Sequence, residues 1–417
     1  MEKTPANKLG IQNIGKLLFD MAYPAIVAQL VNVLYNIVDR MYIGHIPGIG
    51  AQALTGVGVT LPLIMAITAF TSLISMGGAP RAAIRMGRGE PQEAEKILGN
   101  CLVALVILAG VLTATLLLFG EKLLMLFGAS QFTISYALDF MNVYAWGTLF
   151  VQLALGLNAF ITAQGFAKIS MLTILSGALL SIILDPIFIF TFGLGVKGAA
   201  LANVIAQAIS AAWVIHFLTG RKTILKIRKQ YLRNDFKVFL PCLALGLSPF
   251  IMQLTECLLA ITFNSSLQKY GGDLAVGAMT ILSSIMQIAM LPLTGLTQGA
   301  QPIISFNYGA GNPARVKKTF LLLFKVVPLL FIRLVAADNG VSPSFHPDIH
   351  RRSGVDSLFD SGLTNLYGHF FAAWNPNQLP TDVYRTGKCK KLNIFGTLTE
   401  SVPVDSPHLY LTIALDR

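Results

Sequence analysis

The feature that most constrains this chain is a series of long apolar stretches separated by short polar gaps. A membrane-spanning helix needs about 20 apolar residues. Eight stretches of that size and an incomplete ninth occur, at 16–43, 53–80, 97–119, 134–160, 168–192, 197–218, 238–267, 274–304 and 316–335. Charged residues make up only 12% of the chain, about half the share usual in soluble proteins. We therefore predict an all-α polytopic membrane protein.

The Lys and Arg residues of the polar gaps fall mainly on one side of the predicted helices. When the N-terminus is assigned to the cytoplasm and the sides alternate, the inner gaps hold 18 Lys and Arg residues and the outer gaps hold four. This asymmetry follows the positive-inside rule and predicts a multi-pass cell-membrane protein with a cytoplasmic N-terminus. Because the net charge of +11 arises in these gaps, we expect no nucleic-acid partner.

Two parts of the chain share one pattern of glycine and proline. The pattern recurs after 222 positions, from Pro80, Gly87, Gly89 and Pro91 to Pro302, Gly309, Gly311 and Pro313. Six predicted helices separate the copies, so both copies face the same way. A parallel repeat of this kind is typical of duplicated transporters.

The repeat and the longest polar gap define the expected organisation of the chain. We expect a cytoplasmic N-terminus at 1–15 and an N-terminal six-helix lobe at 16–218. A basic cytoplasmic linker at 219–237 precedes the start of a second lobe at 238–332, which holds helices seven to nine. The second lobe is incomplete.

The last part of the chain, 333–417, differs from the rest because it has no long apolar run. We expect a non-membrane tail there. Since six helices cannot close symmetrically with two or three, the tail points to a frameshift or a mis-joined gene. A truncated, inactive protein is therefore the alternative to a working transporter. His346 and His350 have metal-ligand spacing but no further ligand cluster, so we expect no metal site.

Three acidic residues fall inside predicted spanning helices, where ionisable groups are costly and are functional candidates by default. They are Asp39, Asp185 and Glu256. Two of them have structural alternatives, because Asp39 is next to Arg40 and Asp185 precedes Pro186, which can end or kink a helix. Glu256 has no basic neighbour within two helical turns, so it is suited to exchange a proton or to hold a cation.

Polar side chains accompany these acids in the same helices. Asn32, Asn36 and Asp39 have i, i+4, i+7 spacing and share one helix face, which Tyr35 extends. Further polar candidates are Asn158, Asn203 and Gln253. Such a stripe faces either a cavity or another helix, and hydrogen bonding between helices remains the alternative.

Several motifs in order resemble the multidrug and toxic compound extrusion (MATE) family over about residues 10–330. They are PAIVAQLVNVLYNIVDRMYIGH, ILDPIFIFTFGLGVKGAALANVIAQ and GAQPIISFNYGAGNPARVKK. The resemblance implies twelve helices in two six-helix lobes around a central cavity. It also implies a multidrug efflux antiporter that exports small organic cations in exchange for Na⁺ or H⁺ and needs no other cofactor.

The resemblance assigns roles residue by residue. Asp39, Asp185 and Glu256 match acids of the family and are the expected ion-coupling or proton-coupling residues. Asn32, Tyr35 and Asn158 match its polar partners, while Ser181 and Asn203 stand where some relatives carry Asn and Thr. Helices ten to twelve of the family have no counterpart here.

Two other functions are weighed against this one. A lipid-linked sugar flippase of the wider superfamily would need buried basic residues for its anionic substrate, and Arg40 is the only candidate away from the cytoplasmic helix ends. An intramembrane enzyme is disfavoured because no HExxH motif or Ser/His set occurs. We expect a monomeric, non-enzymatic protein in the lipid bilayer.

Overall fold

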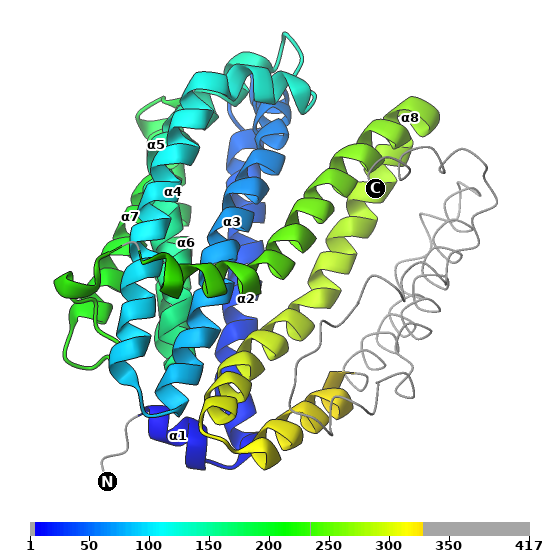
Figure 1. Ribbon diagram of the computed structural model, residues 1–417. Coiled ribbons are helices and arrows are strands. Elements are labelled where there is room, and N and C mark those ends of the chain that lie inside the picture. The colour runs from blue at the N-terminus through cyan, green and yellow to red at the C-terminus, as the bar shows by residue number, and fades with distance from the viewer. Residues whose placement is uncertain (1–4, 234, 328–417) are drawn as a thin grey trace, which may run out of the picture. The chain divides into compact units, whose positions relative to one another are not determined.

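The computed structural model describes residues 5–233 and 235–327, except for most side chains between 260 and 289. The predicted tail at 333–417 lies outside the described residues. All regular elements of the described part are helical (Figure 1). They are α1 (Pro5–Ile11), α2 (Ile14–Gly44), α3 (Gly50–Gly87), α4 (Pro91–Leu126), α5 (Ile134–Ala163), α6 (Ala167–Pro186), the π-helix η1 (Ile187–Thr191), α7 (Gly195–Thr219), the 3₁₀ helix η2 (Lys229–Tyr231) and α8 (Phe236–Gly309).

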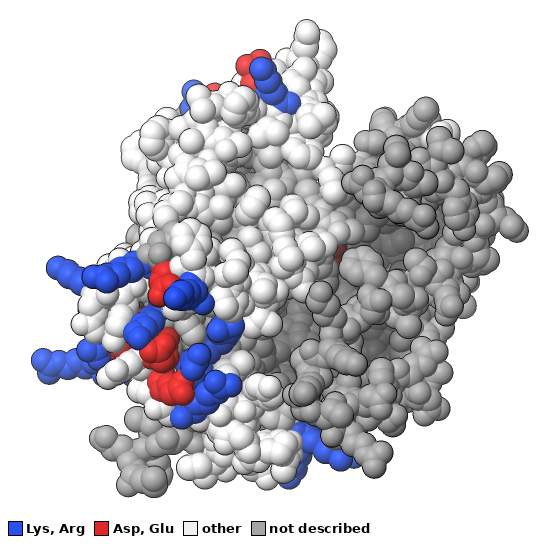
Figure 2. Space-filling view, in the orientation of Figure 1, with Lys and Arg blue, Asp and Glu red and all other residues white. Residues whose placement is uncertain are grey.

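The prediction of an all-α membrane protein is confirmed. Seven of the described helical segments are long and apolar enough to cross a bilayer. On the face shown in Figure 2, charged side chains gather near the ends of the helices, with a broad uncharged band between them. Such a band is what a hydrocarbon environment requires, because a charge there lacks water to solvate it.

Helices α2 to α7 form a bundle with two apolar clusters. One cluster joins Ala83, Leu98, Phe160 and Val214 near one end, and the other joins Ile43, Val57, Phe140 and Val196 near the opposite end. We call the first the basic end, because the N-terminus, the turn between α3 and α4, and the linker after α7 all lie there.

The turn after α3 and its repeat after α8 have one conformation. Gly89 and Gly311 adopt φ angles of 78° and 67°, in the left-handed region that glycine enters without a Cβ clash. Pro91 then starts α4 at a position where the missing N–H costs nothing. The sequence repeat therefore corresponds to a repeated turn.

Helix α8 differs from the prediction of two helices joined by an outer loop. Residues 268–273, which we expected to form that loop, are helical. Both ends of α8 pack on α3 near the basic end, so the segment runs out and returns (Figure 1). The helical pattern continues through the reversal because backbone amides removed from water must hydrogen-bond within the chain. We call 236–263 the first arm and 290–309 the second arm.

Glycine allows α8 to cross the bundle with backbone against backbone. A Cβ at Gly77 would overlap the carbonyl oxygen of Cys242, and a Cβ at Gly246 would overlap that of Leu73. The second arm crosses α2 in the same way, with Gly299 against Ala22. Small residues permit such close helix packing in membranes.

The crossing of α3 with the end of α8 is reciprocal. A Cβ at Gly87 would overlap the carbonyl oxygen of Phe306, and a Cβ at Gly309 would overlap that of Ile84. Ile84 and Phe306 are 222 positions apart, like the two glycines. The crossing is therefore self-complementary about the axis that relates the repeats. We call these glycine crossings of α8 with α2 and α3 the seam.

The linker after α7 is held against the bundle by side chains of the bundle. Gln164 Oε1 accepts hydrogen bonds from the Thr223 hydroxyl and from the backbone N–H groups of Ile224 and Leu225, each at 2.9 Å. The buried Glu95 accepts from the Lys226 N–H at 3.2 Å and pairs with Arg228 at 2.7 Å. The linker is thus part of the bundle, not a free tether.

Candidate functional site

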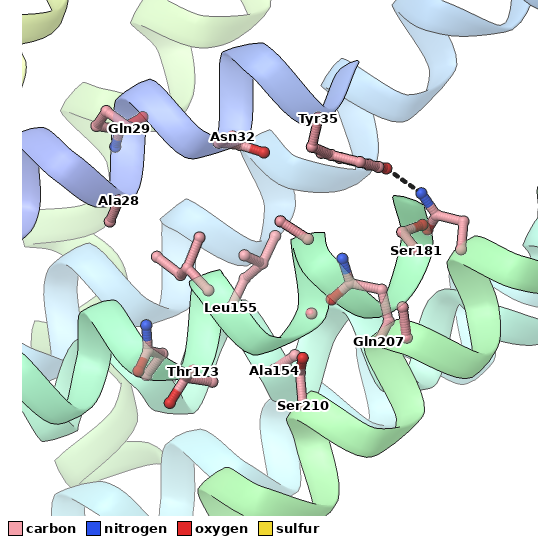
Figure 3. Close-up of a pocket in the computed structure, with 16 residues that line it drawn as sticks. Ala28, Gln29, Asn32, Tyr35, Ala154, Leu155, Thr173, Ser181, Gln207 and Ser210 are labelled. Atoms are coloured by element: carbon pink, nitrogen blue, oxygen red, sulfur yellow. Dashed lines mark hydrogen bonds between the residues drawn. The ribbon is translucent and has the colours of Figure 1, made fainter. Parts of the chain in front are cut away.

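A cavity of about 140 Å³ lies where α2, α5, α6 and α7 meet. Drug-sized ligands fill pockets of about 300 Å³ or more, so this cavity suits an ion or a few water molecules. Figure 3 shows Asn32 and Tyr35 on α2 opposite Gln207 and Ser210 on α7. The polar lining consists of Gln29, Asn32, Tyr35, Asn158, Thr173, Ser181, Asn203, Gln207 and Ser210.

A hydrogen bond ties the two walls of this cavity together. The Asn203 side chain on α7 donates through Nδ2 to the Tyr35 hydroxyl oxygen on α2 (Figure 3). One turn further along α2 is Asp39, which interacts electrostatically with Tyr35. The predicted residues Tyr35, Asp39 and Asn203 therefore belong to one cluster.

Asp185 is the most enclosed acid of the site. It is 0% exposed, and neither carboxyl oxygen has a hydrogen-bond partner among the described residues. Ser181, one turn earlier on α6, is also buried with an unpartnered hydroxyl. Because Asp185 accepts no hydrogen bond from the described residues, it does not act as a helix cap.

The backbone after Asp185 changes geometry. Pro186 has no N–H to donate, and the next five residues form the π-helix η1. Wide turns of this kind often occur at functional positions in helices. The change places Asp185 at the last regular turn of α6, directly beyond the cavity-lining Ser181.

Asp39 on α2 and Asp185 on α6 each lie one helical turn beyond a residue that lines the cavity, Tyr35 and Ser181 respectively. Two carboxylates in a medium of low dielectric constant repel strongly, and an ionised buried carboxylate without a partner costs several kcal/mol or more. A buried, unpartnered carboxyl such as that of Asp185 is therefore favoured in a protonated or cation-bound form.

Asn158 forms another polar part of the cavity wall. Its Nδ2 donates to the backbone oxygen of Ser170 at 3.3 Å, which joins α5 to α6. Its Oδ1 is buried and has no partner among the described residues. An amide oxygen in this position can accept a hydrogen bond or contribute to cation binding.

The remaining predicted site residues lie elsewhere. Asn36 is exposed and donates to the backbone oxygen of Asn32 at 2.6 Å. Gln253 and Glu256 lie on the first arm of α8, where Gln253 is half-buried and Glu256 is exposed. The three acids predicted together therefore divide into a pair in the bundle and a separate acid on α8.

Sequence analysis did not select Thr173, Gln207 or Ser210 as site residues, although all three line the cavity. Asn203, Gln207 and Ser210 have i, i+4, i+7 spacing, the same pattern that identified the polar face of α2. Applying that test to every spanning segment would have found Ser210. Thr173 precedes Ser181 by eight residues on the same face of α6.

Comparison with known proteins places the chain among transporters. The sequence model of the MatE family matches residues 24–187 and 249–337. The multidrug export protein MepA of Staphylococcus haemolyticus is 25% identical over 319 residues, which cover 76% of this chain and 70% of MepA.

Solved structures show the same fold. The outward-facing conformation of a multidrug resistance MATE family transporter of the MOP superfamily aligns with a TM-score of 0.78 and 22% identity, covering 87% of this chain and 80% of that chain. A MOP superfamily transporter from Pyrococcus furiosus aligns with a TM-score of 0.75 and 23% identity, covering 81% and 74%.

Proposed function

The chain belongs to the MatE family, and from this premise we propose that it is a secondary active multidrug efflux antiporter. It exports small organic cations and takes up Na⁺ or H⁺ in exchange. The observation that carries the proposal is the position of Asp39 and the buried, unpartnered Asp185, each one turn beyond the lining of a polar cavity too small for a drug. The relatives named for multidrug export support the substrate class.

The acid pair gives a physical basis for coupling. A coupling ion that neutralises the pair removes a large electrostatic cost, and this changes the relative stability of the two states of the transporter. A proton needs only the carboxyl oxygens, whereas Na⁺ also needs neutral oxygen ligands. Tyr35, Asn158 and Ser181 offer such oxygens around the cavity, so the site is compatible with either ion.

The drug is proposed to bind outside the bundle cavity, between the bundle and α8. Glu256 is exposed on the first arm of α8 amid exposed apolar residues such as Met252, Leu259 and Phe263. An acid on an apolar surface is complementary to an amphiphilic cation, because it pairs with the charge while the side chains contact the hydrophobic part. Transport then requires α8 to separate from α2 and α3 at the seam and to pack against them again in each cycle.

We place the basic end in the cytoplasm of a multi-pass cell-membrane protein. The support is the excess of Lys and Arg in the turns at that end. In the structure the seam lies near this end. Export would therefore begin when the seam opens toward the cytoplasm and the drug binds, and the seam would then close.

Asp185→Asn tests the proposal. The amide no longer offers a negative charge to the coupling ion. Loss of a charge-assisted contact with that ion costs about 1.5–3 kcal/mol, so coupled dye export by cells or proteoliposomes should fall by about tenfold or more. Asp139→Asn is the matched control, because Asp139 pairs with Lys197 at 3.3 Å on the exposed surface. Unchanged export by the well-inserted Asp185→Asn protein would remove the coupling role of this residue.

A further inference from the structure

Two buried thiols meet where α4 and the first arm of α8 contact α3. Cys101 on α4 and Cys242 on α8 are both 0% exposed and belong to one apolar cluster. The Cys242 thiol donates to the backbone oxygen of Val238 at 3.3 Å, and both cysteines lie against the adjacent glycines of α3. The two residues are 141 positions apart in the sequence, so only the fold brings them together.

Neighbouring glycines of α3 explain why the sulfurs approach. A Cβ at Gly78 would lie 2.5 Å from the Cys101 sulfur, and a Cβ at Gly77 would overlap the backbone oxygen of Cys242. Adjacent positions of one helix therefore contact both cysteines. The crossing at Gly77 is also the first contact of the seam after the linker.

A positive charge lies beside the thiol pair. Arg81, one turn beyond Gly77 on α3, acts electrostatically on both cysteines. Its Nε is buried and has no hydrogen-bond partner among the described residues. Neighbouring cations favour the thiolate, which is the reactive form of cysteine.

We propose that Cys101 and Cys242 form a disulfide when the protein meets a hydroperoxide, and that this bond holds the seam closed. One thiolate attacks the peroxide oxygen and becomes a sulfenic acid as the O–O bond breaks. The second thiol then displaces that oxygen as water and forms the S–S bond. In total, two thiols and hydrogen peroxide give one disulfide and two waters.

The surroundings of the two cysteines favour oxidation by hydrogen peroxide over slow, non-specific oxidation. Hydrogen peroxide is small and neutral, so it can enter an apolar region that excludes charged oxidants. Cytoplasmic thiols are otherwise kept reduced, so the resting protein holds the dithiol. Because the linker is already fixed to the bundle by Gln164 and Glu95, a bond at Cys242 would extend that attachment into α8.

The bond is tested first by counting thiols in the full chain. Cys257→Ser and Cys389→Ser leave only the pair, and the purified protein is treated with hydrogen peroxide, denatured and reacted with a maleimide polymer. We expect both thiols to disappear together, the intact mass to fall by that of two hydrogens, and a thiol reductant to restore both. Loss of a single thiol, oxygen addition alone or no change would overturn the proposal.

Matched single variants identify the partners. In the same background, Cys101→Ser and Cys242→Ser each retain one thiol. Neither protein can form the disulfide, so at the peroxide dose that joins the pair neither should lose the mass of two hydrogens, and the thiol that attacks the peroxide should gain oxygen instead. A cross-linked tryptic peptide from the otherwise unaltered protein gives the same information without any substitution. A disulfide that involves Cys257 or Cys389 instead would contradict the assignment.

The second part, closure of the seam, rests on the proposed efflux function. Dye export by proteoliposomes should stop on peroxide treatment and recover with reductant, while the Cys101→Ser protein keeps exporting. If the disulfide forms and export continues, the bond does not lock the seam. If the reduced protein exports nothing at all, the efflux function fails, whereas the disulfide still stands on the thiol count.

Discussion

At the scale of single residues, the surroundings of each acid decide its role. Asp185 is enclosed and, like Asp39, lies one turn beyond the lining of the polar cavity, whereas Glu256 is exposed on an apolar arm of α8. In the mechanism that we propose, the first two respond to an ion that enters the bundle, and Glu256 meets a larger cation at the surface of α8.

Glu256→Gln should weaken export without affecting insertion. Loss of one charge pair with the drug costs about 1.5–3 kcal/mol, so the drug concentration for half-maximal export should rise by about tenfold or more. The measurement is dye export as a function of concentration, with Glu121→Gln on the exposed end of α4 as the control. Normal drug resistance in the Glu256→Gln protein would contradict this role.

Gln164 is a structural residue of comparable importance, because one oxygen accepts three hydrogen bonds from the linker. Gln164→Leu leaves buried N–H groups of Ile224 and Leu225 without a partner. Each such group costs about 1–3 kcal/mol, and the thermal unfolding midpoint in detergent should fall. Equal midpoints for the Leu variant and the unaltered protein would refute the account.

At the scale of helices, the seam depends on the absence of side chains at its crossings. A Cβ at Gly87 would overlap a backbone oxygen of α8, and a Cβ at Gly309 would overlap a backbone oxygen of α3. An added methyl group at either position must therefore push the two helices apart. Overpacking of this kind costs about 1–3 kcal/mol. Because the crossing is reciprocal, substitution at either glycine should have a similar effect.

Gly87→Ala and Gly309→Ala should therefore each speed amide hydrogen exchange in segments 84–87 and 306–309. Gly110→Ala is the matched control, since a Cβ there meets nothing within 4 Å and alanine favours a helix by roughly 0.5–1 kcal/mol. If amide hydrogen exchange in these segments is faster in the Gly110→Ala protein than in the Gly87→Ala and Gly309→Ala proteins, the packing argument is contradicted.

At the scale of the whole molecule, the orientation that we propose rests on the asymmetry of charge. The basic end carries most of the Lys and Arg residues between the spanning segments, and the opposite end carries few. The cost of moving these charges across the bilayer favours retention of the basic end in the cytoplasm.

Two substitutions test this orientation in intact cells. Lys122 lies on the exposed end of α4 away from the basic end, and Lys229 lies on the exposed linker. The two test proteins are Lys122→Cys and Lys229→Cys. With the other cysteines replaced by serine, a membrane-impermeant maleimide should label only Lys122→Cys before lysis and both after lysis. The reverse pattern would invert the topology.

The sequence determined the fold class because the features that define this class are local in the chain. Each spanning segment is marked by its own apolar length, and the repeated turns at Gly89 and Gly311 follow from glycine's access to positive φ. The polar face of α2 also followed from spacing alone. The helical course of 268–273 did not, because the break between two apolar stretches indicated a loop, whereas the membrane environment favours continuous hydrogen bonds.

Only the tertiary structure decided which distant residues meet. Spacing along one helix predicts a shared face, but it carries no information on the partner helix. The hydrogen bond from Asn203 to Tyr35, the position of Asp39 and Asp185 around one cavity, and the packing of Cys101 and Cys242 in one apolar cluster all involve different helices. These contacts depend on how α2 to α8 pack, so they are properties of the whole fold.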